Sequence, residues 1–291
     1  MLKFIDRKKP LLTAAAVVSL LLIGLVQAGR PAVVTAAETQ LQGTVTAVGS
    51  TALLPLVKQA AAEFMAKYPK VTINVSGGGS FTGLSQVASG AADIGNSDVF
   101  ATEELKDKNL VDHQVAIAPF LIVVNPKVTV SALTQEQLIE IFTGKVTNWK
   151  EVGGPNQRIT IIGRATSSGS RATIKEIVLK GREFAKNAIV QDSNGSVRAG
   201  IASTPGSIGY IDAAYLNDTV KTIAYNGVPY SPENVVSGKY PIYAFEHMYT
   251  KGSPQGATKA FIGHIMSAEF QKKYVEKLGF IPVSDLKAAV K

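Results

Sequence analysis

Hydrophobic positions in the first part of the chain alternate between two spacings. Residues 44–48 and 71–75 place apolar side chains at every second position, which predicts two strands. Between them, residues 53–68 repeat apolar side chains at helical spacing, and Pro69 ends that helix. A Gly- and Ser-rich loop, a short helix over 81–88 and a buried strand over 92–95 follow. This order of strand, loop and helix predicts an α/β fold with a mostly parallel sheet flanked by helices.

Two apolar stretches predict strands that cross between two lobes. Residues 115–125 form a long apolar run interrupted by Pro119, and we interpret it as a strand leaving the first lobe. Residues 240–252 are interpreted as the strand that returns. These crossovers divide the chain into lobe one, residues 41–124 plus 239–291, and lobe two, residues 125–238.

Within lobe two the pattern predicts four further elements. They are an amphipathic helix over 133–142, a loop over 144–154 that contains the only tryptophan, a strand–loop–helix unit over 161–178 and a strand over 207–211. After the returning strand, residues 257–278 have helical spacing and are expected to rejoin lobe one.

The N-terminus has the pattern of a secretory signal. Lys3, Arg7, Lys8 and Lys9 precede an uncharged stretch over 11–28, and an Ala-type cleavage site lies in residues 34–37. We therefore interpret residues 1–37 as a signal peptide. The alternative is an uncleaved membrane anchor, because the uncharged stretch is nearly long enough to span a bilayer. In both cases the protein is expected to be extracytoplasmic, either secreted or associated with the outer face of the cell membrane.

Charge and composition narrow the classes of ligand. The formal net charge is +8, and residues 1–37 carry five basic side chains against one acidic one, so 8 − 4 leaves +4 for the rest. That modest excess suits an anionic ligand, and no basic run interleaved with aromatics indicates nucleic-acid binding. The chain has no cysteine and three separated histidines, so no disulfide, metal site or cofactor is expected.

The strand–loop–helix unit over 161–178 predicts an anion site. Its loop contains Arg164 and is followed by Ser168, Gly169 and Ser170, immediately before helical spacing begins. The first N–H groups of a helix have no partner within the helix, and the helix dipole adds partial positive charge there. The alternative is an ordinary strand-to-helix turn in which a serine caps the helix.

Two earlier loops repeat this composition. The first contains Ser50, Thr51 and Ala52, and the second contains Ser80; both precede predicted helices. Loops at the carboxyl ends of strands in an α/β sheet gather where ligands bind. Three converging helix starts would surround a small tetrahedral oxyanion with N–H and O–H donors.

Asp98 is expected near the same site, because it follows the strand over 92–95. A carboxylate repels an anion unless the anion carries a proton that the carboxylate accepts. Phosphate retains a proton at neutral pH and sulfate does not, so Asp98 would favour phosphate by several kcal/mol, to order of magnitude. The alternative is that Asp98 caps a helix over 99–105.

Together these segments resemble the phosphate-binding proteins of ABC-type phosphate transporters, which have the type II periplasmic-binding-protein fold. The resemblance extends from about Gly43 to about Ile281. It rests on five motifs in this order: Val48-Gly-Ser-Thr-Ala52, Gly79-Ser-Phe-Thr-Gly83, Asp93-Ile-Gly-Asn-Ser-Asp98, Ile141-Phe-Thr-Gly144 with Asn148-Trp149, and Gly163-Arg164 with Ser168-Gly-Ser170.

The resemblance implies a set of phosphate contacts and a transport role. The implied contacts are Ser50, Thr51, Ala52, Ser80, Asp98, Arg164, Ser168, Gly169 and Ser170. Some relatives place an aspartate two residues after the arginine, where this chain has Thr166, so Asp98 becomes the candidate partner of Arg164. The implied protein is a monomer that closes its lobes on phosphate and delivers it to the membrane permease subunits of an ABC importer.

Other functions fit the sequence less well. A serine hydrolase needs a base beside its nucleophile, and none of the three histidines lies in a Gly/Ser loop, so we expect no enzyme. A binding protein of the same fold for sulfate or molybdate remains an alternative, as does a phosphate-sensing or surface paralogue.

Overall fold

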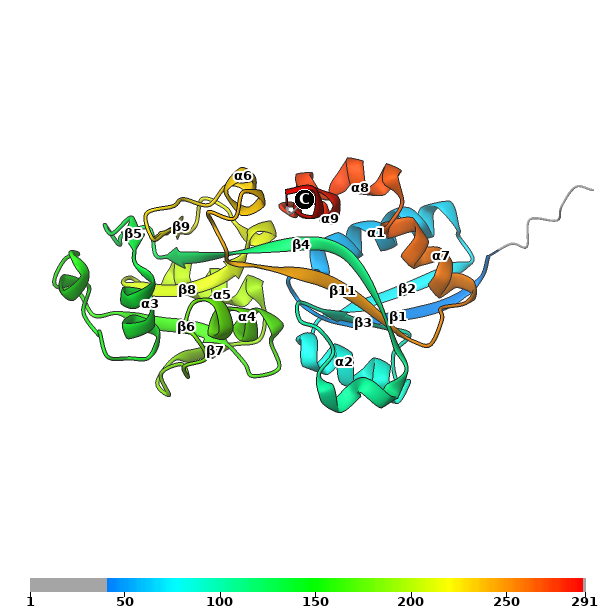
Figure 1. Cartoon of the computed structure of the whole chain (residues 1–291), viewed down its shortest axis with the longest axis horizontal. Helices are drawn as coiled ribbons and strands as arrows, with labels where there is room; N and C mark the ends of the chain where they lie inside the picture. The colour runs from blue at the N-terminus through cyan, green and yellow to red at the C-terminus, as the bar shows by residue number, and fades with distance from the viewer. Residues whose placement is uncertain (1–40, 290–291) are drawn as a thin grey trace, which may run out of the picture. The chain divides into compact units, whose positions relative to one another are not determined.

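The computed structural model describes residues 41–289, which form a mixed α/β unit (Figure 1). Within these residues, nine strands build one sheet in the order β2-β1-β3-β11-β4-β8-β6-β7, with β9 paired to β4. The strands of this sheet are β1 (Gly43–Gly49), β2 (Val71–Ser76), β3 (Ile94–Ser97), β4 (Leu110–Val124), β6 (Thr160–Arg164), β7 (Ile189–Gln191), β8 (Ser207–Asp212), β9 (Lys221–Thr222) and β11 (Tyr243–Lys251). A separate short pair is β5 (Ala132–Leu133) with β10 (Ala224–Tyr225).

Helices cover both faces of the part of the sheet formed by β1, β2 and β3, which we call the first half. The helices α1 and α7 lie on one face and α2 lies on the other (Figure 1). In the second half, which is formed by β6, β7 and β8, the helices α4 and α5 pack against β6. The α-helices are α1 (Leu54–Lys67), α2 (Ser80–Ser89), α3 (Gln135–Phe142), α4 (Gly169–Ile177), α5 (Asn194–Ser203), α6 (Pro232–Val236), α7 (Gly256–Ile265), α8 (Ala268–Tyr274) and α9 (Val283–Ala289). The 3-10 helices are η1 (Glu103–Lys108), η2 (Trp149–Val152), η3 (Ala213–Tyr215) and η4 (Glu276–Leu278).

Strands within each half of the sheet pair in parallel, whereas the strands that join the halves pair antiparallel. Pairs within each half are parallel: β1 with β2 and β3, and β6 with β7 and β8. The joining strands pair antiparallel, β11 with β3 and β4, and β4 with β8. This arrangement is the two-lobe α/β fold expected from the sequence, with β4 and β11 as the crossovers.

The first crossover is one strand through Pro119, as expected from the sequence. The strand β4 begins at Leu110 and continues through Pro119, which lies opposite Tyr243 of β11. From Phe120 onward the strand pairs with β8 instead. The missing N–H of proline therefore falls where β4 changes partners, a position at which a ladder hydrogen bond can be spared.

The helical spacing over 257–278 belongs to three elements instead of one helix. The helix α7 ends at Ile265, and Ser267 caps α8 by accepting a hydrogen bond from the Phe270 N–H at 3.3 Å. A serine that bonds the backbone locally competes with helix continuation, which explains the break. The helices α5 and α6 were not expected, because their apolar faces are short.

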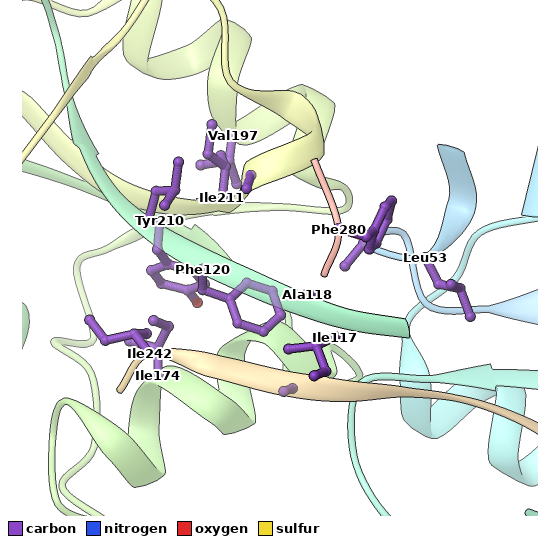
Figure 2. Packing of buried hydrophobic residues seen from close by; sticks show 14 of the residues in the cluster. Leu53, Ile117, Ala118, Phe120, Ile174, Val197, Tyr210, Ile211, Ile242 and Phe280 are labelled. Carbon is purple, nitrogen blue, oxygen red and sulfur yellow. The ribbon is translucent and has the colours of Figure 1, made fainter. Parts of the chain in front are cut away.

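One large apolar cluster extends through both halves, and a smaller separate cluster contains Leu84, Val87 and Tyr249. Figure 2 shows Phe120, Tyr210 and Ile211 packed along β4, with Leu53 and Phe280 further along the same strand. Burial of this surface gives the fold its main stabilisation, since the chain has no disulfide. No helix within residues 41–289 is long and apolar enough to cross a membrane, and the expected signal peptide over 1–37 lies outside the described residues.

Candidate functional site

The starts of α2 and α4 meet directly, although they lie far apart in the sequence. The Phe81 N–H donates to the Ser167 carbonyl oxygen at 3.1 Å. A Cβ atom on Gly169 would lie 2.3 Å from Ser80 Oγ and 2.9 Å from Asp98 Cβ, closer than real contacts allow. Glycine at this position therefore lets the two helix starts approach, as the three-loop prediction requires.

Arg164 is the buried cation of this region. It ends β6, and its side chain is 2% exposed. Its Nη2 donates to the Asp192 carbonyl oxygen at 2.9 Å, whereas Nε and Nη1 have no hydrogen-bond partner. Buried donors without partners are rare in folded proteins, so the guanidinium retains capacity for a ligand. Burial lowers the pKa of Arg164, and the nearby Asp98 carboxylate opposes that shift.

The backbone of Arg164 is fixed from two sides. Its N–H donates to the Tyr210 hydroxyl at 3.2 Å, and its carbonyl oxygen accepts from Arg171 Nη1 at 3.1 Å. Tyr210 is completely buried, which raises the pKa of its hydroxyl to about 12, so it remains neutral. Arg171 also lies 4.3 Å from the centroid of the Phe184 ring. The end of β6 is therefore positioned before any ligand arrives.

Asp98 lies beside the same helix starts and is 3% exposed. Its N–H donates to Ser80 Oγ at 2.9 Å, and its Oδ2 accepts from Ser170 Oγ at 2.8 Å. Its Oδ1 has no hydrogen-bond partner. Asp98 and Arg164 do not form the expected hydrogen bond: Oδ1 of Asp98 and Nε and Nη1 of Arg164 are all without partners, and the two groups interact only through their charges. The helix-cap alternative is also wrong, since the next helix, η1, begins at Glu103 after Thr102.

The first loop joins the site through Thr51. Thr51 Oγ1 accepts from Asn194 Nδ2 at 3.1 Å and from the Asn194 N–H at 3.4 Å. Its carbonyl oxygen accepts from the Tyr215 hydroxyl at 2.6 Å. Since both lone pairs of the Thr51 hydroxyl are engaged, its proton is left to donate elsewhere.

The neighbours of Thr51 make a tight turn. Ser50 Oγ accepts from the N–H groups of Ala52 and Leu53 at 3.0 and 3.1 Å. The Ala52 N–H expected to face the ligand is therefore engaged within its own loop. Ser168, in the third loop, caps α4 by accepting from the Arg171 N–H at 3.2 Å.

Sequence reasoning missed Asn194 and Tyr215. Asn194 is fully buried, begins α5 and joins Thr51 to the end of β8, since its Oδ1 accepts from the Asp212 N–H at 3.0 Å. The signal was present in the sequence: Ser193, Asn194 and Gly195 form a fourth small polar run directly before helical spacing. Tyr215, in η3, had no comparable signal.

The unpartnered atoms define what the site can bind. The Nε and Nη1 nitrogens of Arg164 need acceptors, and Oδ1 of Asp98 needs a donor. An anion that carries a proton supplies both at once, and hydrogen bonds to charged groups are the stronger kind. Within the described residues no cluster of His, Cys, Asp and Glu could hold a metal ion.

Comparisons with known proteins identify the family of this chain. Residues 34–269 match the family model described as a PBP superfamily domain. The phosphate-binding protein PstS of Bacillus subtilis (strain 168) is 46% identical over 253 residues, which are 86% of this chain and 84% of the relative.

Solved structures show the same fold. A substrate-binding protein from Clostridium perfringens, solved with bound phosphate, has a TM-score of 0.79 and 30% identity, covering 83% of this chain and 100% of that chain. An ABC-type phosphate transport receptor from Vibrio cholerae has a TM-score of 0.68 and 28% identity, covering 81% of this chain and 99% of that chain.

Proposed function

This chain belongs to the PBP superfamily and, within it, to the phosphate-binding proteins of the PstS type, and on that premise we propose that it is an extracytoplasmic solute-binding protein. It captures inorganic phosphate between its two lobes and delivers it to the permease of an ABC importer. The observation that carries this proposal is that buried Arg164 has two unpartnered nitrogens, Nε and Nη1, and that buried Asp98 in the same region has an unpartnered oxygen.

Two hydroxyl groups of the site can donate a hydrogen bond to phosphate, and one can accept a hydrogen bond from it. Thr51 and Ser80 already accept N–H groups, so their protons are free for phosphate oxygens. Ser170 donates to Asp98, so its own oxygen can accept a proton from the ion. A ligand with several acceptor oxygens and at least one O–H group matches this division.

The remaining contacts expected from the sequence stay part of the proposal. The first-turn N–H groups of Gly169 and Ser170 supply donors at the positive end of α4. Ser50 and Ser168 shape the loops, and the Ala52 N–H reaches the ion only by sharing its bond to Ser50.

Phosphate differs from the alternative oxyanions because it carries a proton at neutral pH. Sulfate carries no proton at neutral pH, so it would leave Asp98 Oδ1 unpartnered beside another negative charge. An unsatisfied buried charged acceptor costs about 1–3 kcal/mol or more. The geometry therefore favours phosphate over sulfate, and the same reasoning applies to molybdate.

The site is proposed to bind and not to catalyse. Each histidine of the chain interacts elsewhere: His113 with Thr250, His247 with Asp112 and His264 with Glu63. None of these pairs includes a serine of the three loops, so the described residues offer no activated nucleophile.

The lobe boundaries follow from the two crossovers. Lobe one is residues 41–124 plus 239–291, and lobe two is residues 125–238. Loops one and two and Asp98 then belong to lobe one, and Arg164 and the start of α4 belong to lobe two. Because the ion satisfies groups on both lobes only when they meet, binding stabilises the closed form, which is proposed to dock on the permease as a monomer.

Calorimetric titration of residues 38–291 with phosphate, sulfate and arsenate tests the proposal. We expect saturable binding of phosphate and of arsenate, which also carries a proton, and much weaker binding of sulfate. Equal affinity for sulfate and phosphate would contradict the role given to Asp98, and absence of phosphate binding would contradict the function.

A further inference from the structure

A second carboxyl group lies behind the proposed ion site. Glu246, in the crossover β11, is fully buried, and both of its carboxyl oxygens have no hydrogen-bond partner. A buried charge without a partner is among the most destabilising features a fold can contain, so the group needs a physical explanation. Neither the fold nor the phosphate contacts described above use it.

Glu246 and Asp98 both lie just beyond the same end of the β11–β3 pairing. The antiparallel pairing of β11 with β3 ends where His247 lies opposite Ser97, and Glu246 and Asp98 are the next residues of the two segments beyond that end. After burial, a hydrogen-bonding interaction with the Asp98 side chain is among the causes that raise the pKa of Glu246, so the two carboxyl groups lie within hydrogen-bonding reach of one another. The orphaned oxygens of both residues therefore face the same small region.

The surroundings of Glu246 disfavour its ionised form. Burial contributes most to raising the pKa of Glu246 well above its ordinary value, and the carboxylates of Asp98 and Asp212 add to that shift. Asp212, at the end of β8, is itself fully buried with an unpartnered Oδ2. On the neighbouring β4, the residue opposite Glu246 is Ala116, which brings no charge.

The other charged and titratable groups near this cluster lie beyond Asp98 and Asp212. Arg164, at the end of β6, interacts with the Asp98 charge, and Tyr215 of η3 lies near Asp98 and Asp212. On β11 itself, His247 bonds Asp112 and is not directed at this cluster.

We propose that Glu246 is a positioning residue that carries a proton at neutral pH and donates it in a hydrogen bond to Asp98, which holds the Asp98 carboxylate toward the ion. Each carboxylate oxygen has about two acceptor sites, so Oδ1 of Asp98 can accept from Glu246 and still needs the proton of phosphate for its second site, while Oδ2 accepts from Ser170. A neutral Glu246 also avoids adding a second negative charge beside the anion. This inference rests on the proposed phosphate-binding function.

Two substitutions distinguish the effect of the hydrogen-bond donor of Glu246 from the effect of its size. Glu246→Gln keeps a neutral N–H donor of similar size, and Glu246→Met keeps the volume without a donor. We expect the glutamine variant to bind phosphate within about threefold of the wild type at neutral pH. We expect the methionine variant to lose about tenfold or more in phosphate affinity, together with part of its preference over sulfate.

A pH series adds a readout that a purely structural role would not change. Phosphate affinity is measured by calorimetry from about pH 6 to about pH 9.5 for the wild type and Glu246→Gln. Their affinity ratio should stay near one until the Glu246 carboxyl ionises and should then favour the glutamine variant, because only the wild type gains a negative charge beside the ion.

The protonation state is measured directly on the wild type, so the test does not depend on the variants folding. In protein labelled with 13C at the glutamate carboxyl, one resonance should have the shift of a protonated acid at pH 7. If every glutamate is ionised at that pH, the inference is wrong. It is also wrong if Glu246→Met keeps both the affinity and the selectivity of the wild type.

The control is Thr250→Val, which changes another buried polar side chain of β11. An equal loss of phosphate affinity in this variant would show that disturbing the strand suffices and would overturn the positioning role. If the wild type binds no phosphate, the proposed function fails, and the NMR result still reports on the Glu246 proton.

Discussion

At the scale of single residues, the site depends on a balance between one buried cation and several buried acids. Arg164 is buried with two unpartnered nitrogens, and Asp98 faces the same region with an unpartnered oxygen. In a medium of low dielectric constant these charges interact more strongly than in water. Substitutions at these two positions should therefore change ligand binding more than they change the fold.

Arg164→Ala should weaken phosphate binding by about 2–5 kcal/mol, because it removes the desolvated charge partner of the ion. Calorimetry on the purified variant measures the loss. Arg158→Ala, at an exposed position, is the matched control and should bind like the wild type. Unchanged affinity in Arg164→Ala would remove the arginine from the site.

Asp98→Asn should narrow the preference for phosphate over sulfate. The asparagine amide carries no charge and can donate to a sulfate oxygen, whereas the carboxylate can only accept. Competition of sulfate against bound phosphate gives the ratio of affinities. Asp93→Asn, whose carboxylate bonds the exposed Thr46 N–H, is the control and should keep the wild-type ratio. If sulfate competes no better against Asp98→Asn, the account of discrimination fails.

Asp212 should make the stability of the protein depend on pH. Burial raises the pKa of Asp212 well above 3.8, although the hydrogen bond from the Ala214 N–H opposes the shift and Asp98 adds to it. Between 3.8 and the raised value the folded protein binds a proton that the unfolded chain releases. This contribution to stability is fully present below pH 3.8 and is lost as the pH rises, by about 1.4 kcal/mol per pH unit.

Asp212→Asn should remove that contribution, because asparagine has no proton to release. Urea unfolding of the wild type and the variant at several pH values above 3.8 measures the difference. The free energy of unfolding of the variant should decline less steeply with rising pH. Parallel curves for the two proteins would show that Asp212 does not carry a proton in the folded state.

At the scale of elements, the decisive feature is the approach of two helix starts. Helices α2 and α4 begin at Ser80 and Gly169, and these residues are in contact. The contact brings two positive helix ends to one place, which is unfavourable without an anion between them or beside them. The geometry of these starts should therefore matter for affinity, while the helices themselves are stabilised by packing elsewhere.

Gly169→Ala should reduce phosphate affinity by about tenfold or more, because the added methyl group would lie 2.3 Å from Ser80 Oγ. Alanine suits a helix, so the thermal midpoint without ligand should not fall. Gly263→Ala, in α7, is the control, since its added methyl group meets open space. Wild-type affinity in Gly169→Ala would show that the two helix starts need not meet to bind the ion.

At the scale of the whole molecule, hydrogen bonds that do not involve the ion join the two proposed lobes. Thr51 accepts from Asn194 and Tyr215, and Phe81 donates to Ser167. These bonds form only when the lobes meet, so they favour the closed form together with the ligand. Closure should therefore be sensitive to residues that never touch phosphate.

Tyr215→Phe should lower phosphate affinity about two- to tenfold, because it removes one such hydrogen bond, worth about 0.5–1.5 kcal/mol. Stopped-flow measurement should assign the loss to faster dissociation. Tyr249→Phe is the control: its hydroxyl accepts from the Ala101 N–H within proposed lobe one. If both variants bind alike, the bond to Thr51 does not contribute to closure.

Much of the fold could be predicted because its signals are local. The strand and helix spacings over the first lobe gave β1, α1, β2 and α2 with ends near those observed. The short strand expected over 92–95 is β3 and lies two residues later, at Ile94–Ser97. Asp93 precedes this strand, and its side chain accepts a hydrogen bond from the Thr46 N–H. The helical run over 257–278 was less accurate, because Ser267 caps a new helix between α7 and α8.

The sequence by itself determined which segments become helix starts and which polar groups those starts carry. Serine, threonine and glycine favour a helix start through bonds and backbone angles that involve only residues adjacent in the chain, and Arg164 lies next to one of these segments. Only the tertiary structure decided their partners. Ser170, not Arg164, bonds Asp98; Asn194 reaches Thr51; and Glu246 lies behind them on the returning strand. Burial and electric field at a residue come from segments distant in the chain, so spacing along the sequence cannot supply them.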